Sequence, residues 1–135
     1  MNKLTGTIVH IESSEHMSMV DVDVKGDIFS SIVLETPETA SYLKVGRAVT
    51  LMFKETEVSI GKNLSGQISL RNRFGAVIRS IEASGILAKV LLDYQSVQIV
   101  SVISARSAVK LNLKKGDSVE WLVKTNEVSL LTEKG

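Results

Sequence analysis

Val20-Asp21-Val22-Asp23-Val24 is the stretch of this sequence that most directly predicts its fold. Valine alternates with aspartate, which is the period-two pattern of a strand with one buried and one solvated face. Valine is also among the residues that favour strands. At an offset of 70 positions, Val90 and Asp93 stand where Val20 and Asp23 stood. The same strand is therefore expected twice.

The correspondence at this offset extends outward from that strand without a gap. Further identical pairs include Asn2/Asn72, Ile11/Ile81, Glu12/Glu82, Ser14/Ser84, Ser31/Ser101, Leu43/Leu113, Lys44/Lys114, Gly46/Gly116, Val49/Val119, Lys54/Lys124, Glu57/Glu127, Val58/Val128 and Ser59/Ser129. A period of this length fits a small domain and is too long for a solenoid unit. We therefore predict two copies of one module in tandem: residues 1–66, ending in a linker at 61–66, and residues 67–135.

Each copy has the pattern of five short strands and one short helix. The expected strands cover 7–12, 20–24, 28–34, 48–53 and 58–60 in the first copy, and 76–82, 87–94, 97–103, 118–123 and 128–131 in the second. Five short strands per copy predict a small barrel or sandwich. A helix is expected over 105–113 with Ser104 as its N-cap. Its counterpart is expected near 35–37, where the only proline of the chain suits a first helical turn.

Composition narrows the possible functions. The chain has no cysteine, which excludes disulfides and thiolate metal sites, and its net charge is +1. No signal peptide or membrane-spanning apolar run is visible, so a cytoplasmic protein that does not enter membranes is expected. His10 and His16 have no partner at metal-ligand spacing. No nucleophile elbow, P-loop or dinucleotide motif occurs, and we expect no catalytic residues and no enzyme.

Hydrogen-bond donors are concentrated in the second copy. Ser69 and Arg71 precede its first strand, Ser104 and Ser107 surround the expected helix start, and Lys124 ends its fourth strand. Each alone is explained as a helix cap or a surface charge. Together, hydroxyls, a guanidinium, an ammonium and helix-start N–H groups are all donors to anions. A tetrahedral dianion has no protons to give, so this composition suits a small oxyanion.

Four stretches, in order, resemble motifs of the molbindin module, which is also called the Mop or TOBE domain. Ser69–Phe74 resembles its opening Ser-Ala-Arg-Asn-x-Leu motif, and Ile103–Ser107 resembles its stretch into the helix. Leu113–Val119 resembles its Leu-x-x-Gly-x-x-Val turn, and Val123–Val128 resembles its Val-Lys-Ala-Thr-x-Val close. The resemblance implies an all-β fold of two OB-like five-stranded β-barrel modules in tandem, each with one short helix. It also implies molybdate or tungstate as the bound ligand, with metal present only as the oxyanion.

The resemblance further implies where the oxyanion binds. Its sites form between modules, usually across subunits, which implies a homo-oligomer with a trimer favoured and a dimer possible. The implied oxyanion-binding residues are Ser69, Leu70, Arg71, Asn72, Ser104, Ser107, Lys124 and Lys54. Ser69 and Arg71 would act from one module, and Ser104, Ser107 and Lys124 from a neighbour. The first copy lacks the Ser-x-Arg part and has Leu34 and Pro37 opposite the two serines, so it is expected to be a degraded binder or a structural partner.

Three functions remain open at this stage. The first is cytoplasmic binding of molybdate or tungstate for storage, buffering or sensing. The second is a structural or regulatory effector domain of a molybdate-responsive regulator or transporter, with sites partly lost. The third is an OB-type module that binds nucleic acid, which needs exposed stacking aromatics and a basic groove. Aromatic residues make up only 4% of the chain, so no direct nucleic-acid contact is expected.

Overall fold

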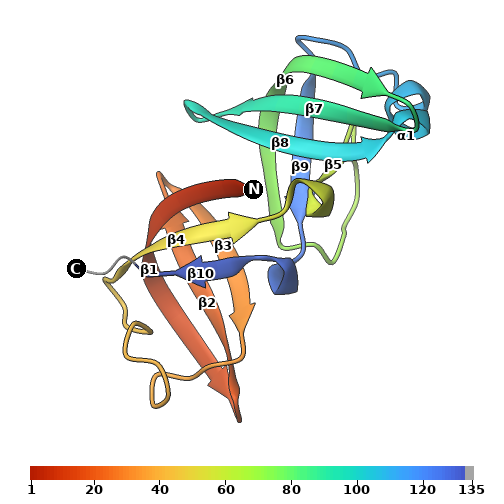
Figure 1. Ribbon diagram of the computed structural model, residues 1–135. Coiled ribbons are helices and arrows are strands. Elements are labelled where there is room, and N and C mark those ends of the chain that lie inside the picture. Colours follow the sequence, from red (N-terminus) through yellow and green to blue (C-terminus); the bar gives the residue numbers. More distant parts are fainter. Residues whose placement is uncertain (133–135) are drawn as a thin grey trace.

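The computed structural model describes residues 1–132, and these form two curled five-stranded sheets (Figure 1). The elements of the first copy are β1 (Asn2–Ser14), β2 (Met17–Val24), β3 (Asp27–Val33), β4 (Ala48–Phe53), the 3-10 helix η1 (Glu55–Glu57) and β5 (Ser59–Gly61). Those of the second copy are β6 (Asn72–Ser84), β7 (Leu87–Tyr94), β8 (Val97–Ser104), α1 (Ala105–Lys110), β9 (Ser118–Val123), η2 (Thr125–Glu127) and β10 (Ser129–Leu131). The second set repeats the first at an offset of 70, so the predicted all-β tandem fold is confirmed.

The long first strand of each copy bends so that it can serve two partners. β1 pairs with β4 over its first half and with β2 over its second, and the register shifts between Ile8 and His10. β6 shows the same shift between Ile78 and Ser80. At each bend, a glycine in the turn before the fourth strand of the copy donates its N–H to the bulged strand. Gly46 N donates to Ile8 O at 2.7 Å, and Gly116 N donates to Ile78 O at 2.8 Å. Both glycines have positive φ, which explains their repetition.

The two copies exchange their last strands. β5 of the first copy pairs with β9 in the second sheet, with Ile60 opposite Trp121. β10 of the second copy pairs with β4 in the first sheet, with Leu130 opposite Leu51. The sheet orders are therefore β10-β4-β1-β2-β3 and β5-β9-β6-β7-β8. The division at residue 66 stays a prediction about folding units, with 133–135 of its second unit outside the described residues, and both sheets draw a strand from across that division.

Only one of the two expected helices forms. α1 is capped as expected, since Ser104 Oγ accepts a hydrogen bond from Ser107 N, but it ends at Lys110. The counterpart in the first copy is a turn, so that prediction is wrong. Leu34 stands where Ser104 caps α1, and Thr39 Oγ1 both accepts from Thr36 N and donates to Thr36 O, which competes with helical hydrogen bonding. No helix within residues 1–132 is long and apolar enough to cross a membrane.

An aromatic cluster joins the cores of the two sheets. Phe29 and Phe53 come from the first copy, and Phe74, Tyr94 and Trp121 come from the second. The rings of Phe53 and Trp121 stack with centroids 5.5 Å apart, and those of Phe29 and Phe74 stack at 4.1 Å. Trp121 is 0% exposed. The buried residues therefore form one continuous core, which fixes the position of one copy on the other.

Candidate functional site

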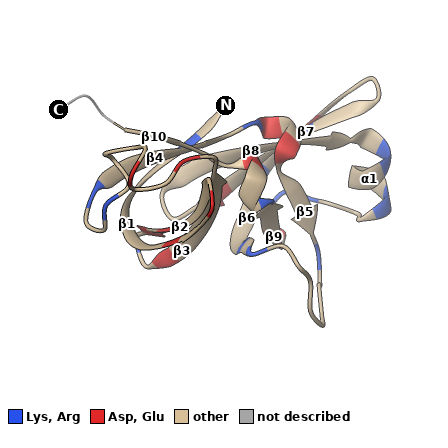
Figure 2. Ribbon diagram, turned by 90° about the horizontal axis from the view of Figure 1, so that it is seen from below, with Lys and Arg blue, Asp and Glu red and all other residues tan. Residues whose placement is uncertain are grey.

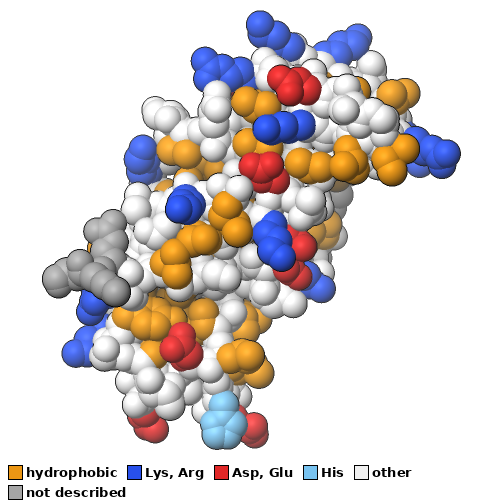
Figure 3. All heavy atoms as spheres, viewed as in Figure 1, with side chains coloured by type: hydrophobic (Ala, Val, Ile, Leu, Met, Phe, Trp, Pro, Cys, Tyr) orange, Lys and Arg blue, Asp and Glu red, His pale blue; other side chains and the backbone are white. Residues whose placement is uncertain are grey.

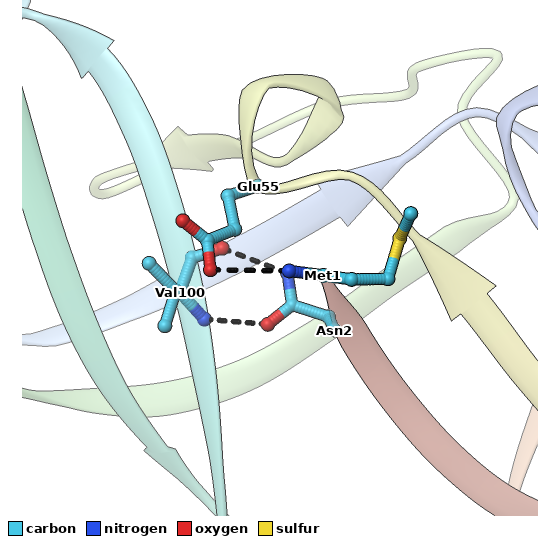
Figure 4. A network of polar contacts seen from close by, with 4 residues as sticks. All are labelled: Met1, Asn2, Glu55 and Val100. Carbon is cyan, nitrogen blue, oxygen red and sulfur yellow. Dashed lines mark hydrogen bonds and ion pairs between the residues drawn. The ribbon is translucent and has the colours of Figure 1, made fainter.

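Two asparagines join the copies through their side-chain amides. Asn72, at the start of β6, accepts from Ser30 N and donates to Ser30 O, both at 2.8 Å. Asn2, at the start of β1, makes the same pair of 2.8 Å bonds with the backbone of Val100 (Figure 4). Each amide satisfies outward-facing peptide groups of the strands β3 and β8, which end their sheets. The identity Asn2/Asn72 is thus explained by the joint between the copies, and an oxyanion contact of Asn72 stays a prediction.

Two serines repeat this reciprocal arrangement. Ser101 in β8 donates its hydroxyl to Val58 O at 2.7 Å. Ser31 in β3 donates to Val128 O at 2.5 Å. Both serines are fully buried. Several positions that are identical between the copies therefore make hydrogen bonds that hold the copies together.

Arg71 lies directly beside this joint. Its Nε donates to Ser30 Oγ at 3.1 Å, and Ser30 Oγ donates to Asp21 Oδ1 at 2.7 Å. The side chain of Ser30 is buried, whereas Arg71 is exposed. Within residues 1–132, neither terminal guanidinium nitrogen of Arg71 makes a hydrogen bond or an ion pair. These N–H groups can therefore bind an anion. Ser69 is exposed and Leu70 half-buried in the segment that leads to Arg71.

A second arginine near Arg71, Arg73, is neutralised. Arg73 forms a two-pronged ion pair with Glu120, with Nε–Oε2 at 2.6 Å and Nη2–Oε1 at 2.9 Å. The hydrogen bond from Arg73 lowers the pKa of Glu120, and the same bond raises the pKa of Arg73. Because this fork is occupied by a carboxylate, Arg71 is better suited than Arg73 to accept a mobile anion.

The start of α1 forms a second group of donors. Ser104 Oγ accepts from Ser107 N at 3.0 Å and donates to Ser107 Oγ at 2.9 Å, and both serines are exposed. A hollow of about 540 Å³ opens here, lined by Gly85, Ile86, Leu87, Ser104, Ala105 and Arg106. None of these lining residues is acidic, so an anion would meet only donors and apolar groups.

The two groups lie at opposite ends of β6. Asn72, the first residue of β6, pairs with Val123, which places Arg71 and Lys124 at that end. Ser84, the last residue of β6, pairs with Leu87, and Leu87 pairs with Ser104. Figure 1 shows α1 at the outer end of the second sheet, away from the first sheet. Within one chain, Lys124 therefore accompanies Arg71 and not the serines with which it was grouped in the prediction.

Lys54 lies in a different, mixed-charge setting. It lines a hollow of about 260 Å³ together with Met1, Met52, Phe53, Glu57, Asn126, Glu127 and Ser129. Two carboxylates in this lining set it apart from the donor-only hollow at α1. The ammonium of Met1 is itself 3.3 Å from Glu55 Oε2. The prediction of Lys54 as an anion ligand remains, but its surroundings are less favourable for a dianion.

Charge is distributed unequally between the copies, a feature hidden by the net charge of the whole chain. Residues 1–66 contain six Lys or Arg and nine Asp or Glu, for a net charge of −3, whereas residues 67–135 contain ten and six, for +4. Figure 2 shows basic residues on α1, and Figure 3 shows carboxylates and a histidine gathered at the opposite end of the molecule. Counting charge by halves of the sequence would have revealed this asymmetry.

Comparisons with known proteins agree with this architecture. Residues 68–130 match the family profile of the TOBE domain. The structure of the cytoplasmic molybdate-binding protein ModG, in a crystal form with molybdate bound, aligns with a TM-score of 0.92 over 98% of this chain and 96% of that chain, at 26% identity. A molybdate-binding protein from Sporomusa ovata is 34% identical over 50% of this chain and 100% of its own, with a TM-score of 0.49. No curated protein sequence gives a significant match.

Two OB-like sheets with exchanged strands, and donors gathered on the second copy, define a tandem module of the ligand-binding type. The profile match covers the second copy, and the offset of 70 carries the same elements onto the first. The second copy belongs to the TOBE domain family, and the chain as a whole shares the fold of ModG. The resemblance inferred from the four sequence motifs is thereby confirmed.

Proposed function

We propose that this protein binds molybdate or tungstate in the cytoplasm and serves in storage, buffering or sensing of the oxyanion. One observation carries the proposal: Arg71 presents terminal guanidinium N–H groups that no residue of the described chain occupies. The serine pair at the start of α1, in a hollow without acidic lining, supplies further donors. The likeness to ModG, a molybdate-binding protein, supports the choice of ligand. The proposed oxyanion-binding residues are Ser69, Leu70, Arg71, Asn72, Ser104, Ser107 and Lys124. Lys54 is proposed as an additional, weaker contact.

The proposed site is completed by a second copy of the chain. Arg71 and Ser104 lie at opposite ends of β6, so one chain cannot bring both to one small anion. Within each chain the first copy carries a net charge of −3 and the second a net charge of +4. This asymmetry favours contact between the first copy of one chain and the second copy of a neighbouring chain. A trimer closes such a head-to-tail contact, and a dimer remains the second possibility.

Nucleic-acid binding is the less favoured alternative. Five of the six aromatic residues lie in the cluster between the sheets, and Phe29, Phe53 and Trp121 are at most 1% exposed. Bases therefore find little aromatic surface on which to stack. Single-stranded oligonucleotides should produce no change in tryptophan fluorescence and no mobility shift.

Calorimetric titration with molybdate, tungstate and sulfate tests the proposal. We expect Arg71→Ala, Ser104→Ala and Lys124→Ala each to weaken molybdate binding by about tenfold or more, because a charge-assisted hydrogen bond contributes about 1.5–3 kcal/mol. Arg79→Ala is the matched control, since Arg79 is exposed and pairs only loosely with Asp93 at 3.6 Å. Absence of heat with either metal oxyanion would refute the proposed function.

Mixing two weakly binding variants tests whether the site spans two chains. Arg71→Ala and Ser104→Ala chains are unfolded together and refolded as mixed oligomers. If one site takes Arg71 from one copy and Ser104 from another, part of the sites regain both groups and tight binding returns. Light scattering gives the oligomeric state of the same samples. Failure of the mixture to bind more tightly than either parent, in an oligomer shown to contain both chains, would place the site within one chain.

A further inference from the structure

The first copy lacks counterparts of Arg71, Ser104 and Ser107, yet it contacts Arg71 of the second copy directly. We propose that Ser30 and Asp21 of the first copy are positioning residues for Arg71, which they hold so that its two terminal nitrogens face an incoming oxyanion. This inference rests on the proposed function and adds to it a role for the first copy, which the sequence predicts to be a degraded binder or a structural partner. Neither Ser30 nor Asp21 touches the anion itself.

The contacts form a relay with a defined direction. Ser30 has one hydroxyl proton, and Asp21 Oδ1 lies 2.7 Å from Ser30 Oγ and accepts it. The lone pairs of Ser30 Oγ are then left for Arg71 Nε, which donates at 3.1 Å. Without the carboxylate, the Ser30 hydroxyl could turn its proton toward the guanidinium and repel the N–H group of Arg71. Asp21 therefore determines which way the serine hydroxyl points, and the hydroxyl determines how the guanidinium is oriented.

The backbone of Ser30 is held as firmly as its side chain. Asn72 bonds both the N–H and the C=O of Ser30 at 2.8 Å, and Asn72 follows Arg71 in the sequence. The Arg71-Asn72 dipeptide thus makes three hydrogen bonds to one residue that is 2% exposed. A guanidinium placed by such a buried anchor loses less freedom when an anion binds than a free surface arginine would.

The relay restrains Arg71 without neutralising it. Among the described residues, Asp21 does not approach Arg71 closely enough to form an ion pair. Only Nε is engaged, which leaves both terminal nitrogens as donors. Arg73 shows the contrasting case, because Glu120 occupies its fork directly. A serine between carboxylate and guanidinium fixes orientation while the anion-facing N–H groups stay available.

Within residues 1–132 the relay occurs beside Arg71 alone, although the scaffold around it is repeated. At the offset of 70, Val100 corresponds to Ser30, Leu91 to Asp21, and Met1 to Arg71. Asn2 still holds Val100 by its backbone, as Asn72 holds Ser30 (Figure 4). The amide joint therefore occurs in both copies, whereas the Asp21–Ser30 contact is found beside Arg71.

Calorimetric titration of molybdate into Ser30→Ala and Asp21→Asn variants of the full chain tests the inference. Each is expected to weaken binding about fivefold to tenfold, less than the loss of Arg71 itself, because the guanidinium remains and only its orientation is released. Ser30→Ala removes the acceptor of Arg71 Nε, and Asp21→Asn replaces the charged acceptor of the Ser30 hydroxyl by a neutral amide that no longer fixes its direction. Asp23→Asn is the control, because Asp23 lies two residues along β2, changes charge equally, and accepts only from Gly26 N. Its binding should stay within about twofold of the unaltered protein.

A double-variant comparison separates positioning from a merely structural effect. In an Arg71→Lys background the ammonium has no fork to orient, so Ser30→Ala should cause no further loss of binding. An equal loss in both backgrounds, or no loss in the unaltered background, would overturn the inference while leaving the proposed function intact. If the unaltered chain binds no molybdate, both fail together. Thermal unfolding without anion, measured on every variant, shows that the compared proteins are folded.

Discussion

The two copies share a backbone and differ in what they place on it. The aromatic residues of the second copy occupy positions that are aliphatic in the first, and the two phenylalanines of the first copy occupy positions that are aliphatic in the second. The pairs are Phe74/Leu4, Tyr94/Val24, Trp121/Leu51, Ile99/Phe29 and Val123/Phe53. Because Phe29 and Phe53 pack on Trp121, the five rings form a single cluster that neither copy could build alone. The copies are therefore complementary, and neither is a spare version of the other.

The same comparison explains how binding and support are divided. The second copy carries Arg71, Ser104 and a net charge of +4, whereas the first carries −3 and no donors at the matching positions. Yet the first copy supplies Ser30 behind Arg71 and strand β5 beside β9. Loss of ligand groups in one half of a repeat thus does not mean loss of function, because that half can become the support of the other.

Separating the copies should have the largest effect. A fragment of residues 67–135 lacks β5 and loses the packing of Phe29 and Phe53 on Trp121. We expect it to be unfolded or aggregated alone, and to gain strand structure when mixed with residues 1–66. Circular dichroism and tryptophan fluorescence of the separate and mixed fragments measure this. A monomeric fragment 67–135 that unfolds cooperatively by itself would contradict the interdependence of the copies.

Removing one amide clamp should have the next largest effect, and an unequal one. Asn72→Ala leaves the buried N–H and C=O of Ser30 unpaired, at a cost of about 2–4 kcal/mol in the free energy of unfolding. Asn2→Ala acts on Val100, whose bonds are only part-buried, and should cost about 1–2 kcal/mol. Urea denaturation compares the two variants. Equal losses would show that the two joints are equivalent despite their different surroundings.

Much of the fold could be predicted because strand patterns are local. The alternation at Val20–Val24 and the offset of 70 located every strand, and Ser104 marked the start of α1 correctly. β1 and β6 begin earlier than expected, since Asn2 and Asn72 are buried by contact with the other copy and show no local pattern. The exchange of β5 and β10 could not be predicted, because the pattern of a three-residue strand indicates a strand and does not specify its partner.

The candidate site was predictable in its chemistry and less so in its placement. Motifs identified the donor residues, but the length of β6, which separates Arg71 from Ser104, becomes meaningful only in the folded sheet. Asp21 looked like the solvated side of an alternating strand. Its bond to Ser30, and through it to Arg71, depends on how the two copies dock. Contacts between units of a repeat are not encoded in the local pattern of either unit.

Alkaline pH should destabilise the molecule through its two tyrosines. Burial, together with a hydrogen bond to Asp27, raises the pKa of Tyr94, and burial with a bond to Glu35 raises the pKa of Tyr42. A phenol that ionises more easily when unfolded favours unfolding as pH rises above about 10. Urea denaturation from about pH 9 to about pH 11 should therefore show falling stability. Tyr94→Phe should flatten this fall more than Tyr42→Phe, since Tyr94 is the more deeply buried; an unchanged slope in both would contradict the assignment.

The smallest expected difference between the copies is electrostatic. Arg73 and Glu120 pair across β6 and β9, whereas the first copy has Lys3 and Thr50 at the matching positions. The hydrogen bond from Arg73 lowers the pKa of Glu120 in the folded protein. The pair therefore stabilises the fold fully above the ordinary glutamate pKa, and this stabilisation is lost as the pH falls from there through the lowered pKa.

The pair is only partly buried, so its removal should have a small effect. Glu120→Gln is expected to cost at most about 1 kcal/mol in urea denaturation at neutral pH, and high salt should reduce the loss further. Thr50→Val, at the matching place in the first copy, controls for a change on the same strand face that removes no ion pair. Glu120→Gln should therefore destabilise the protein much less than Asn72→Ala. Equal losses would show that the fold depends on this ion pair as much as on the buried amide joint, which would contradict the expectation drawn from the burial of the two groups.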